Sequence, residues 1–151
     1  MTTTIEVTFE LRHENAKLPV RGTPGSFGLD LFAATREYVH DDMVRHDTGL
    51  HIRQNVLADY GMPLILPRSS VAKHRIMLIN SVGLIDTDYP GTIQAYFLGF
   101  APCKFYDVGD KIAQLIFVPP CILFAKNHKY ERIPIQVQNE KRTGGYGSTG
   151  S

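Results

Sequence analysis

The sequence contains no tryptophan and only two cysteines, Cys103 and Cys121. Two distant cysteines are too few for a disulfide framework or a thiolate metal site, so we expect both to be reduced and to lie in a β core. An excess of charge of one sign is also missing, because 16 Lys and Arg residues stand against 15 Asp and Glu residues. Without a global field to attract a nucleic acid or an anionic membrane, we expect neither as a partner.

Long apolar runs are absent as well. None approaches the roughly 20 residues that span a bilayer, and the N-terminal MTTTIEVTFE lacks the basic and apolar succession of a signal peptide. The expected location is therefore cytoplasmic. What the chain does have is an ordinary globular composition, with 43% hydrophobic and 21% charged residues in a length of 151. This suffices for one domain with a sizeable core.

Short extended segments dominate the hydrophobic pattern. Apolar and polar residues alternate over residues 5–11 and 93–97, which is the period of a strand with one buried face. Residues 111–118 and 133–137 are further short runs rich in branched side chains. Glycines and prolines separate these pieces, and only residues 69–75 have helical character, beginning with two serines able to cap the first turn. The sequence therefore predicts an all-β barrel or sandwich.

The C-terminal residues 139–151 (NEKRTGGYGSTGS) differ in character from the rest. They contain four glycines and one isolated aromatic residue, Tyr146. Taken alone, this composition is typical of a disordered terminus. We expect residues 1–138 to form the β domain and residues 139–151 to form a flexible C-terminal arm.

Residues 66–74 (LPRSSVAKH) combine a cation with hydroxyl groups. A strand is expected to end at Pro67, and Arg68, Ser69 and Ser70 then open the short helix. A forked cation beside hydroxyls and helix amides suits a phosphate group. An ordinary serine cap beside a surface arginine is the alternative interpretation.

Residues 79–91 (INSVGLIDTDYPG) place polar groups in a turn between two apolar strands. Asn80, Asp86 and Tyr89 offer a hydrogen-bonding amide, a candidate general base and an aromatic surface. The alternative is a plain β-hairpin, since Asp and Gly are favoured in such turns.

Two polar residues interrupt apolar strands. Gln114 lies within KIAQLIF, and Asp30 lies between Leu29 and Leu31. Gln114 can be explained as a solvent-facing position of an alternating strand, and Asp30 as an ion-paired or hydrogen-bonded carboxylate. For Asp30, contact with a metal ion, direct or through water, is the alternative.

Taken together and in order, these segments resemble the five motifs of the trimeric dUTP pyrophosphatase (dUTPase) family. GLDLFAA at 28–34, PRSSVA at 67–72 and NSVGLIDTDYPG at 80–91 resemble the first three, while GDKIAQLIF at 109–117 and GGYGSTG at 144–150 resemble the last two. The resemblance implies a jelly-roll-like β barrel in a homotrimer, with active sites built from different subunits and closed by an exchanged C-terminal arm. It implies hydrolysis of dUTP to dUMP and pyrophosphate.

The resemblance also assigns roles to individual residues. Asp86 is the expected general base for the water that attacks the α-phosphorus. The residues expected to contact the nucleoside are Asn80 and the backbone of Gly83, Leu84, Ile85 and Asp86 at the uracil edge, Tyr89 beneath the deoxyribose, and Gln94 just beyond.

A second group of residues is expected to hold the triphosphate. Arg68, Ser69, Ser70 and Gln114 would bind the phosphate chain. Asp30 would orient water on a Mg²⁺ ion that bridges the three phosphates.

In the arm, Tyr146 stands where the family more commonly has phenylalanine, and with Gly147 and Ser148 it is expected to close over the substrate. The family usually carries an arginine five residues before this aromatic residue. This chain has Lys141 there, followed by Arg142, so either side chain is a candidate for the γ-phosphate.

Two other functions remain open at this point. A dCTP deaminase shares the fold, although the DTDY run at 86–89 matches the dUTPase motif better. A binding protein that has kept the fold without catalysis is the other alternative, and the presence of every matched polar residue argues against it.

Overall fold

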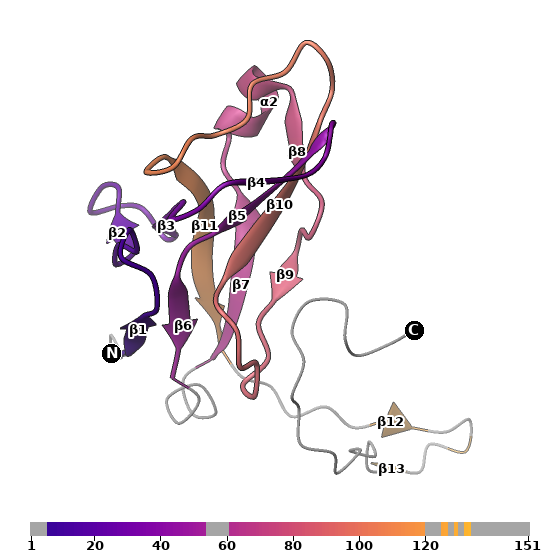
Figure 1. The fold of residues 1–151 in the computed structure, drawn as a ribbon. Helices are drawn as coiled ribbons and strands as arrows, with labels where there is room; N and C mark the ends of the chain where they lie inside the picture. The colour runs from indigo at the N-terminus through magenta and orange to yellow at the C-terminus, as the bar shows by residue number, and fades with distance from the viewer. Residues whose placement is uncertain (1–5, 54–60, 120–124, 127–128, 130–131, 134–151) are drawn as a thin grey trace.

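The structure is a computed structural model that describes residues 6–53, 61–119, 125–126, 129 and 132–133 (Figure 1). Within these residues, every strand pairing is antiparallel, and the one helix is the five-residue α2 (Ser70–His74). The all-β expectation is confirmed. No helix in these ranges is long and apolar enough to cross a membrane.

Two sheets make up most of the molecule. The five-stranded sheet has the order β2 (Val20–Arg21), β3 (Leu29–Phe32), β11 (Lys111–Val118), β7 (Met62–Pro67) and β9 (Gly83–Leu84). The four-stranded sheet has the order β4 (Glu37–His40), β5 (Met43–Asp47), β10 (Gln94–Gly99) and β8 (Ile76–Leu78). Two smaller pairs are β1 (Phe9–Leu11) with β6 (Leu50–Ile52) and β12 (Ala125–Lys126) with β13 (Arg132–Ile133).

One hydrophobic core lies between the two sheets. The five-stranded sheet contributes Leu31, Ile65, Ile112 and Leu115, and the four-stranded sheet contributes Val44, Ile76, Leu78 and Phe97. Burying such a side chain stabilises the fold by roughly 1.5–3 kcal/mol. The core therefore holds the two sheets face to face, as expected for a jelly-roll-like fold.

The strands expected around residues 93–97 and 111–118 are confirmed as β10 and β11, whereas most of the run expected at residues 133–137 lies outside the described residues. The buried face of β10 follows the alternation in the sequence, whereas β11 buries the successive residues Ile112 and Ala113 together with Leu115. The first strand covers only residues 9–11 of the described chain, and Leu11, expected on its buried face, is 53% exposed. Cys103 is exposed in the segment after β10, so its predicted place in a β core was wrong; the chain has already left the sheet at Gly99.

His46 is the one fully buried histidine in the described ranges, and its environment predicts a pH dependence of stability. The ring is 0% exposed on β5, with Nδ1 3.2 Å from the Thr35 carbonyl oxygen and edge-on contacts to Phe97 and Tyr106. Its Nε2 is buried without a hydrogen-bond partner in the described chain. Burial lowers the pKa of His46 below its usual range, against the opposing effect of the Thr35 carbonyl.

Because its native pKa is depressed, His46 destabilises the fold as the pH falls. Below a pH of about 6.5 the unfolded chain binds a proton that the native protein still excludes, so the free energy of unfolding decreases, by at most about 1.4 kcal/mol per pH unit. We expect His46→Leu to reduce this slope between neutral and mildly acidic pH. Urea unfolding of both proteins at several pH values measures it, and equal slopes would contradict the assignment.

Candidate functional site

A cluster of one carboxylate and two cations occupies one end of the five-stranded sheet. Asp30 Oδ2 lies 2.9 Å from Lys111 Nζ, and Asp30 Oδ1 lies 3.3 Å from Arg68 Nε. The Asp30 side chain is only 13% exposed, so the carboxylate is largely shielded from water, while Lys111 is 38% exposed. Two cations against one carboxylate leave the cluster with excess positive charge, which suits a bound polyanion.

Strand register brings these residues together from distant parts of the sequence. Gln114 on β11 lies directly opposite Asp30 on β3 and opposite Leu66 on β7, and Arg68 follows the end of β7. A Cβ atom at Gly28 would lie 2.7 Å from Gln114 Oε1, so the glycine allows the backbone to approach this amide. Gln114 is therefore half-buried beside the charged cluster rather than a simple solvent-facing position.

Arg68 is held in place yet keeps hydrogen-bonding capacity. Its Nη1 donates to the Lys111 carbonyl oxygen at 3.1 Å. Its Nε is buried and makes no hydrogen bond within the described part of the chain, although it faces Asp30. Lys111 and Asp30 thus anchor one side of the guanidinium, and a charged fork held in one orientation suits an oxyanion.

The two serines after Arg68 differ in their surroundings. The expected cap is wrong at Ser69, which has helical backbone angles and makes no side-chain cap hydrogen bond to α2. Ser70 Oγ lies 2.6 Å from the hydroxyl of Tyr106, a residue that is 2% exposed. This contact fixes the Ser70 side chain, which as a hydroxyl still has a further lone pair for a ligand.

Residues 79–91, which are expected to contact the nucleoside, connect β8 to β10. Both of these strands belong to the four-stranded sheet, but between them the chain crosses to the five-stranded sheet and forms β9. There β9 pairs with β7, with Gly83 opposite Ile65 and Leu84 opposite Leu64, and the Ile85 amide donates to the Pro63 carbonyl oxygen at 3.0 Å. The segment is thus not a plain hairpin. Its backbone follows the edge of the five-stranded sheet.

Gly83 is required by this crossing. A Cβ atom there would collide with Ile65 Cγ1 and would lie 2.9 Å from the Asn80 carbonyl oxygen. We expect Gly83→Ala to displace β9, to destabilise the fold by about 1–3 kcal/mol through overpacking, and to lower kcat/KM. Gly25→Ala is the matched control, because its Cβ would meet nothing within 4 Å. Thermal unfolding and steady-state kinetics of both variants test this, and equal behaviour would contradict it.

Beyond β9, a tight turn carries the candidate base. The Tyr89 amide donates to the Asp86 carbonyl oxygen at 3.1 Å, which closes the turn, and the Asp86 side chain is exposed. The Tyr89 ring lies over Gly91, where a Cβ atom would be 2.7 Å from Cζ, and its hydroxyl donates to the Thr92 carbonyl oxygen at 3.0 Å. The turn therefore holds the aromatic ring in a defined orientation.

Asn80 and Gln94 already have protein partners. Asn80 Nδ2 donates to the Gln94 carbonyl oxygen at 2.9 Å, and Asn80 Oδ1 accepts from the Tyr96 amide at 3.0 Å. The Gln94 side chain donates to Asp47 Oδ2 at 3.1 Å and accepts from the Tyr96 hydroxyl at 3.2 Å. Each amide retains one donor hydrogen and one lone pair for a ligand.

Asp86 and the charged cluster around Asp30 lie near opposite ends of β7. Ile85 is anchored at Pro63, near the start of β7, whereas Arg68 follows its end. Five residues of extended strand separate these points by about 17 Å. Figure 1 shows the same separation, with α2 at one end of the sheets and the turn between β9 and β10 at the other. One chain therefore does not bring Asp86 to the cluster around Arg68.

No group of three or more His, Cys, Asp or Glu side chains within the described ranges is arranged to hold a metal ion. The interpretation of Asp30 as an ion-paired carboxylate is confirmed. A single carboxylate that already faces two cations fits Mg²⁺ only through water, which is how Mg²⁺ is commonly held beside substrate phosphates.

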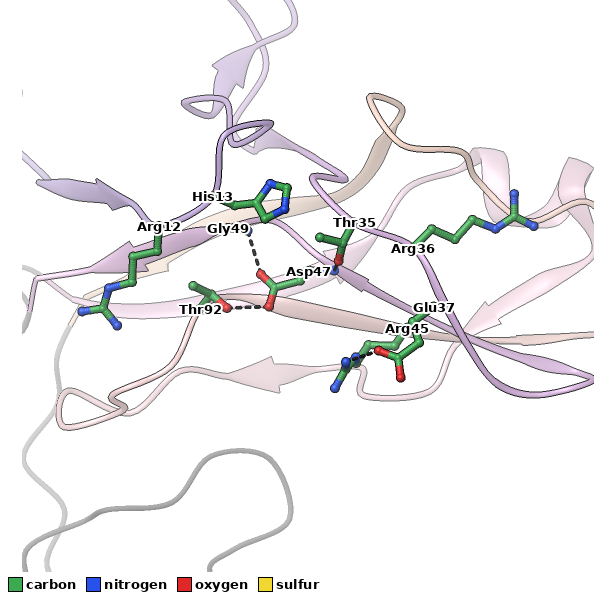
Figure 2. Close-up of a pocket in the computed structure, with 9 residues that line it drawn as sticks. All are labelled: Arg12, His13, Thr35, Arg36, Glu37, Arg45, Asp47, Gly49 and Thr92. Carbon is green, nitrogen blue, oxygen red and sulfur yellow. Dashed lines mark hydrogen bonds and ion pairs between the residues drawn. The ribbon is translucent and has the colours of Figure 1, made fainter.

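Some expected residues lie outside the described ranges. These are Lys141, Arg142, Tyr146, Gly147 and Ser148, together with the boundary expected at residue 138. A pocket of about 460 Å³ is lined by residues that include Arg12, Asp47 and Thr92 (Figure 2), and none of the predicted site residues lines it, although Asp47 accepts a hydrogen bond from Gln94.

The fold defines a jelly-roll-like β protein, and the cluster around Asp30 carries excess positive charge. The family model described as dUTPase matches residues 14–150. Over 140 residues the chain is 38% identical to the deoxyuridine 5'-triphosphate nucleotidohydrolase of Pseudomonas fluorescens strain Pf0-1, covering 89% of this chain and 87% of that protein. The corresponding protein of Shewanella halifaxensis is 36% identical over 141 residues, with the same coverage. The chain belongs to the dUTPase family.

Solved structures agree on the fold. A mutant dUTPase of Staphylococcus bacteriophage 80alpha with dUpNHpp has a TM-score of 0.67 at 19% identity, covering 98% of this chain and 100% of that chain. A mutant dUTPase of phage phi11 of S. aureus, described with a structural Mg(II) ion, has a TM-score of 0.65 at 21% identity, covering 81% and 95%.

Three residues with defined contacts at the site were missed from the sequence. Lys111 pairs with Asp30, Tyr106 contacts Ser70, and Asp47 accepts from Gln94. Lys111 lies in the fourth motif, so its place beside Gln114 could have indicated a role at the site. Tyr106 and Asp47 gave none, because their roles depend on contacts between residues distant in sequence.

Proposed function

We propose that this chain hydrolyses dUTP to dUMP and pyrophosphate as an enzyme of nucleotide metabolism. The observation that carries the proposal is its membership of the dUTPase family over residues 14–150. The geometry supports it, because strand register gathers Asp30, Arg68 and Gln114 into one cluster with excess positive charge. The curated relatives named above carry this activity in their names.

The active site is shared between subunits of a homotrimer. The separation of about 17 Å along β7 supports this, since the base of one chain cannot reach a phosphate held by its own Arg68. Asp86 of one subunit would face the cluster of the next, and residues 139–151, with Tyr146, Gly147 and Ser148, would close over the substrate. Lys141 or Arg142 would meet the γ-phosphate. Light scattering of the purified protein tests the trimer.

In the reaction, Asp86 accepts a proton from water, and the water oxygen forms a bond to the α-phosphorus. The bond from the α-phosphorus to the bridging oxygen breaks, and pyrophosphate leaves. Arg68, Ser69, Ser70 and Gln114 orient the phosphates so that attack and departure are aligned. A positioned base contributes roughly 10² to 10⁴-fold, and the fixed donors supply a larger share.

The backbone at the outer edge of β9 binds uracil in this proposal. Ile85 uses its amide toward β7, so the backbone groups of Leu84 point the other way, toward the edge that no described strand covers. That edge offers an N–H and a carbonyl to the base, with Asn80 nearby in sequence. A mismatched base leaves buried polar groups unpaired, at about 1–3 kcal/mol each. Tyr89 beneath the deoxyribose excludes a 2′-hydroxyl.

Mg²⁺ is the expected cofactor. Bound to the three phosphates, it would neutralise the charge that develops on them. Asp30 would orient one of its water ligands, and Lys111 and Arg68 hold that carboxylate in place.

Pyrophosphate release tests the proposal, with dUTP, dCTP, dTTP and UTP compared in the presence of Mg²⁺ and of a chelator. We expect Mg²⁺-dependent release from dUTP alone. Ammonia release from dCTP would instead identify a deaminase. Tight dUTP binding without turnover would identify a binding protein, which is the second alternative.

A further inference from the structure

Side chains anchor the segment from Pro90 to Gln94 at every residue. Five successive carbonyl oxygens each accept a hydrogen bond from a side chain. The donors are Arg12 Nη1 to Pro90 at 2.7 Å, His51 Nδ1 to Gly91 at 2.8 Å, Tyr89 Oη to Thr92 at 3.0 Å, Thr48 Oγ1 to Ile93 at 2.9 Å, and Asn80 Nδ2 to Gln94 at 2.9 Å. Side-chain anchoring of five carbonyls in a row fixes the path of this segment.

Asp47 fixes the side chains of the same segment. It ends β5 directly opposite Gln94 on β10. Its Oδ2 accepts from Thr92 Oγ1 at 2.6 Å, and its Oδ1 accepts from the Gly49 amide at 2.7 Å (Figure 2). The same Oδ2 also accepts from Gln94 Nε2 at 3.1 Å. All three donors are uncharged, so this carboxylate acts here as a hydrogen-bond acceptor, the arrangement that gives strong and directional bonds.

A chain of hydrogen bonds connects Asp47 to the turn after β9 that carries Asp86. Thr92 donates to Asp47 with its hydroxyl and accepts the Tyr89 hydroxyl with its carbonyl oxygen. Tyr89 in turn closes the turn that begins at Asp86. A shift of Thr92 therefore moves the Tyr89 ring.

We propose that Asp47 is a positioning residue for nucleoside binding, which fixes Tyr89 through Thr92 and orients the Gln94 amide. The inference rests on the proposed function of Tyr89 and Gln94 as substrate contacts. Asp47 itself lies one strand away and contacts no substrate in this scheme. Its loss is expected to affect substrate binding more than the chemical step.

Asp47→Asn tests the inference, because asparagine keeps the shape but replaces one acceptor oxygen by a donor. We expect KM for dUTP to rise roughly 10-fold with kcat within about twofold, since a loosened contact mainly weakens binding. Thr92→Val, which removes only the hydroxyl, is expected to act in the same direction. Asp42→Asn, in the exposed turn between β4 and β5, is the matched control and is expected to keep the parent kinetics. Unchanged KM in Asp47→Asn overturns the proposal.

A double-mutant cycle separates positioning from general destabilisation. In a Tyr89→Phe background, where the bond to Thr92 is already absent, the effect of Asp47→Asn on KM should shrink. If the two effects on KM are fully additive, Asp47 does not act through Tyr89, and the proposed link through Thr92 is wrong.

Hydrogen exchange of the amides between residues 86 and 93 provides a readout without substrate. These amides should exchange faster in Asp47→Asn than in the parent protein, while the melting temperature stays the same. Equal exchange rates would show that Asp47 does not fix this segment. A parent protein that fails to cleave dUTP but shows this exchange difference would refute the proposed function alone. The two failures are therefore distinguishable.

Discussion

Replacing Asp86 by asparagine is expected to lower kcat for dUTP hydrolysis by roughly 10² to 10⁴-fold, the usual contribution of a positioned general base. The side chain is exposed at the turn after β9, and asparagine has nearly the same shape, so the substitution does not disturb the hydrophobic core. The melting temperature should therefore stay unchanged, and KM should change little. Stopped assays of pyrophosphate release, together with thermal unfolding, measure the three quantities.

Asp41→Asn is the matched control for this change. Asp41 is equally exposed, in the turn between β4 and β5, and lies outside the predicted site. It should keep the parent kcat. An Asp86→Asn protein with a kcat close to that of the control would show that another group accepts the proton.

The second large effect is expected for Arg68, and it tests whether two subunits share the proposed site. Arg68→Gln removes charge-assisted hydrogen bonds of about 1.5–3 kcal/mol each, so kcat/KM should fall roughly 10²-fold. When this variant and Asp86→Asn are mixed in equal amounts and allowed to exchange subunits, about a quarter of the sites combine an intact Arg68 with an intact Asp86. Activity should return to about a quarter of the parent value in this cyclic arrangement.

Arg53→Gln serves as the control for Arg68→Gln, because Arg53 is 56% exposed and pairs with Glu10. It should retain kcat/KM. No recovery of activity on mixing, after subunit exchange has been verified with labelled chains, would mean that Arg68 and Asp86 act within one chain. The separation along β7 argues that recovery will occur.

The strands β10 and β11 were predicted best from the sequence. The bounds of β11 agree with the run 111–118, and the buried face of β10 follows its alternation. Leu11 departs from the pattern because β1 pairs only with the short β6 in the described chain, so its far end stays open to solvent. Alternation assigns a face but does not show whether another element covers it.

The site was predicted in part, and the contacts between strands account for the rest. The charge of Arg68 and the polarity of Gln114 were visible in the sequence, and their proximity follows from the register of β7, β11 and β3. Asp47 and Tyr106 carried no such signal, since Asp47 meets Gln94 only across β5 and β10. Cross-strand partners depend on pairing that the residues of one strand do not specify.

Hydrolysis of dUTP in water labelled with heavy oxygen tests the central claim most directly. If Asp86 directs water to the α-phosphorus, the label must appear in dUMP, and pyrophosphate must remain unlabelled. Label in pyrophosphate, or failure to cleave dUTP at all in the presence of Mg²⁺, would contradict the account.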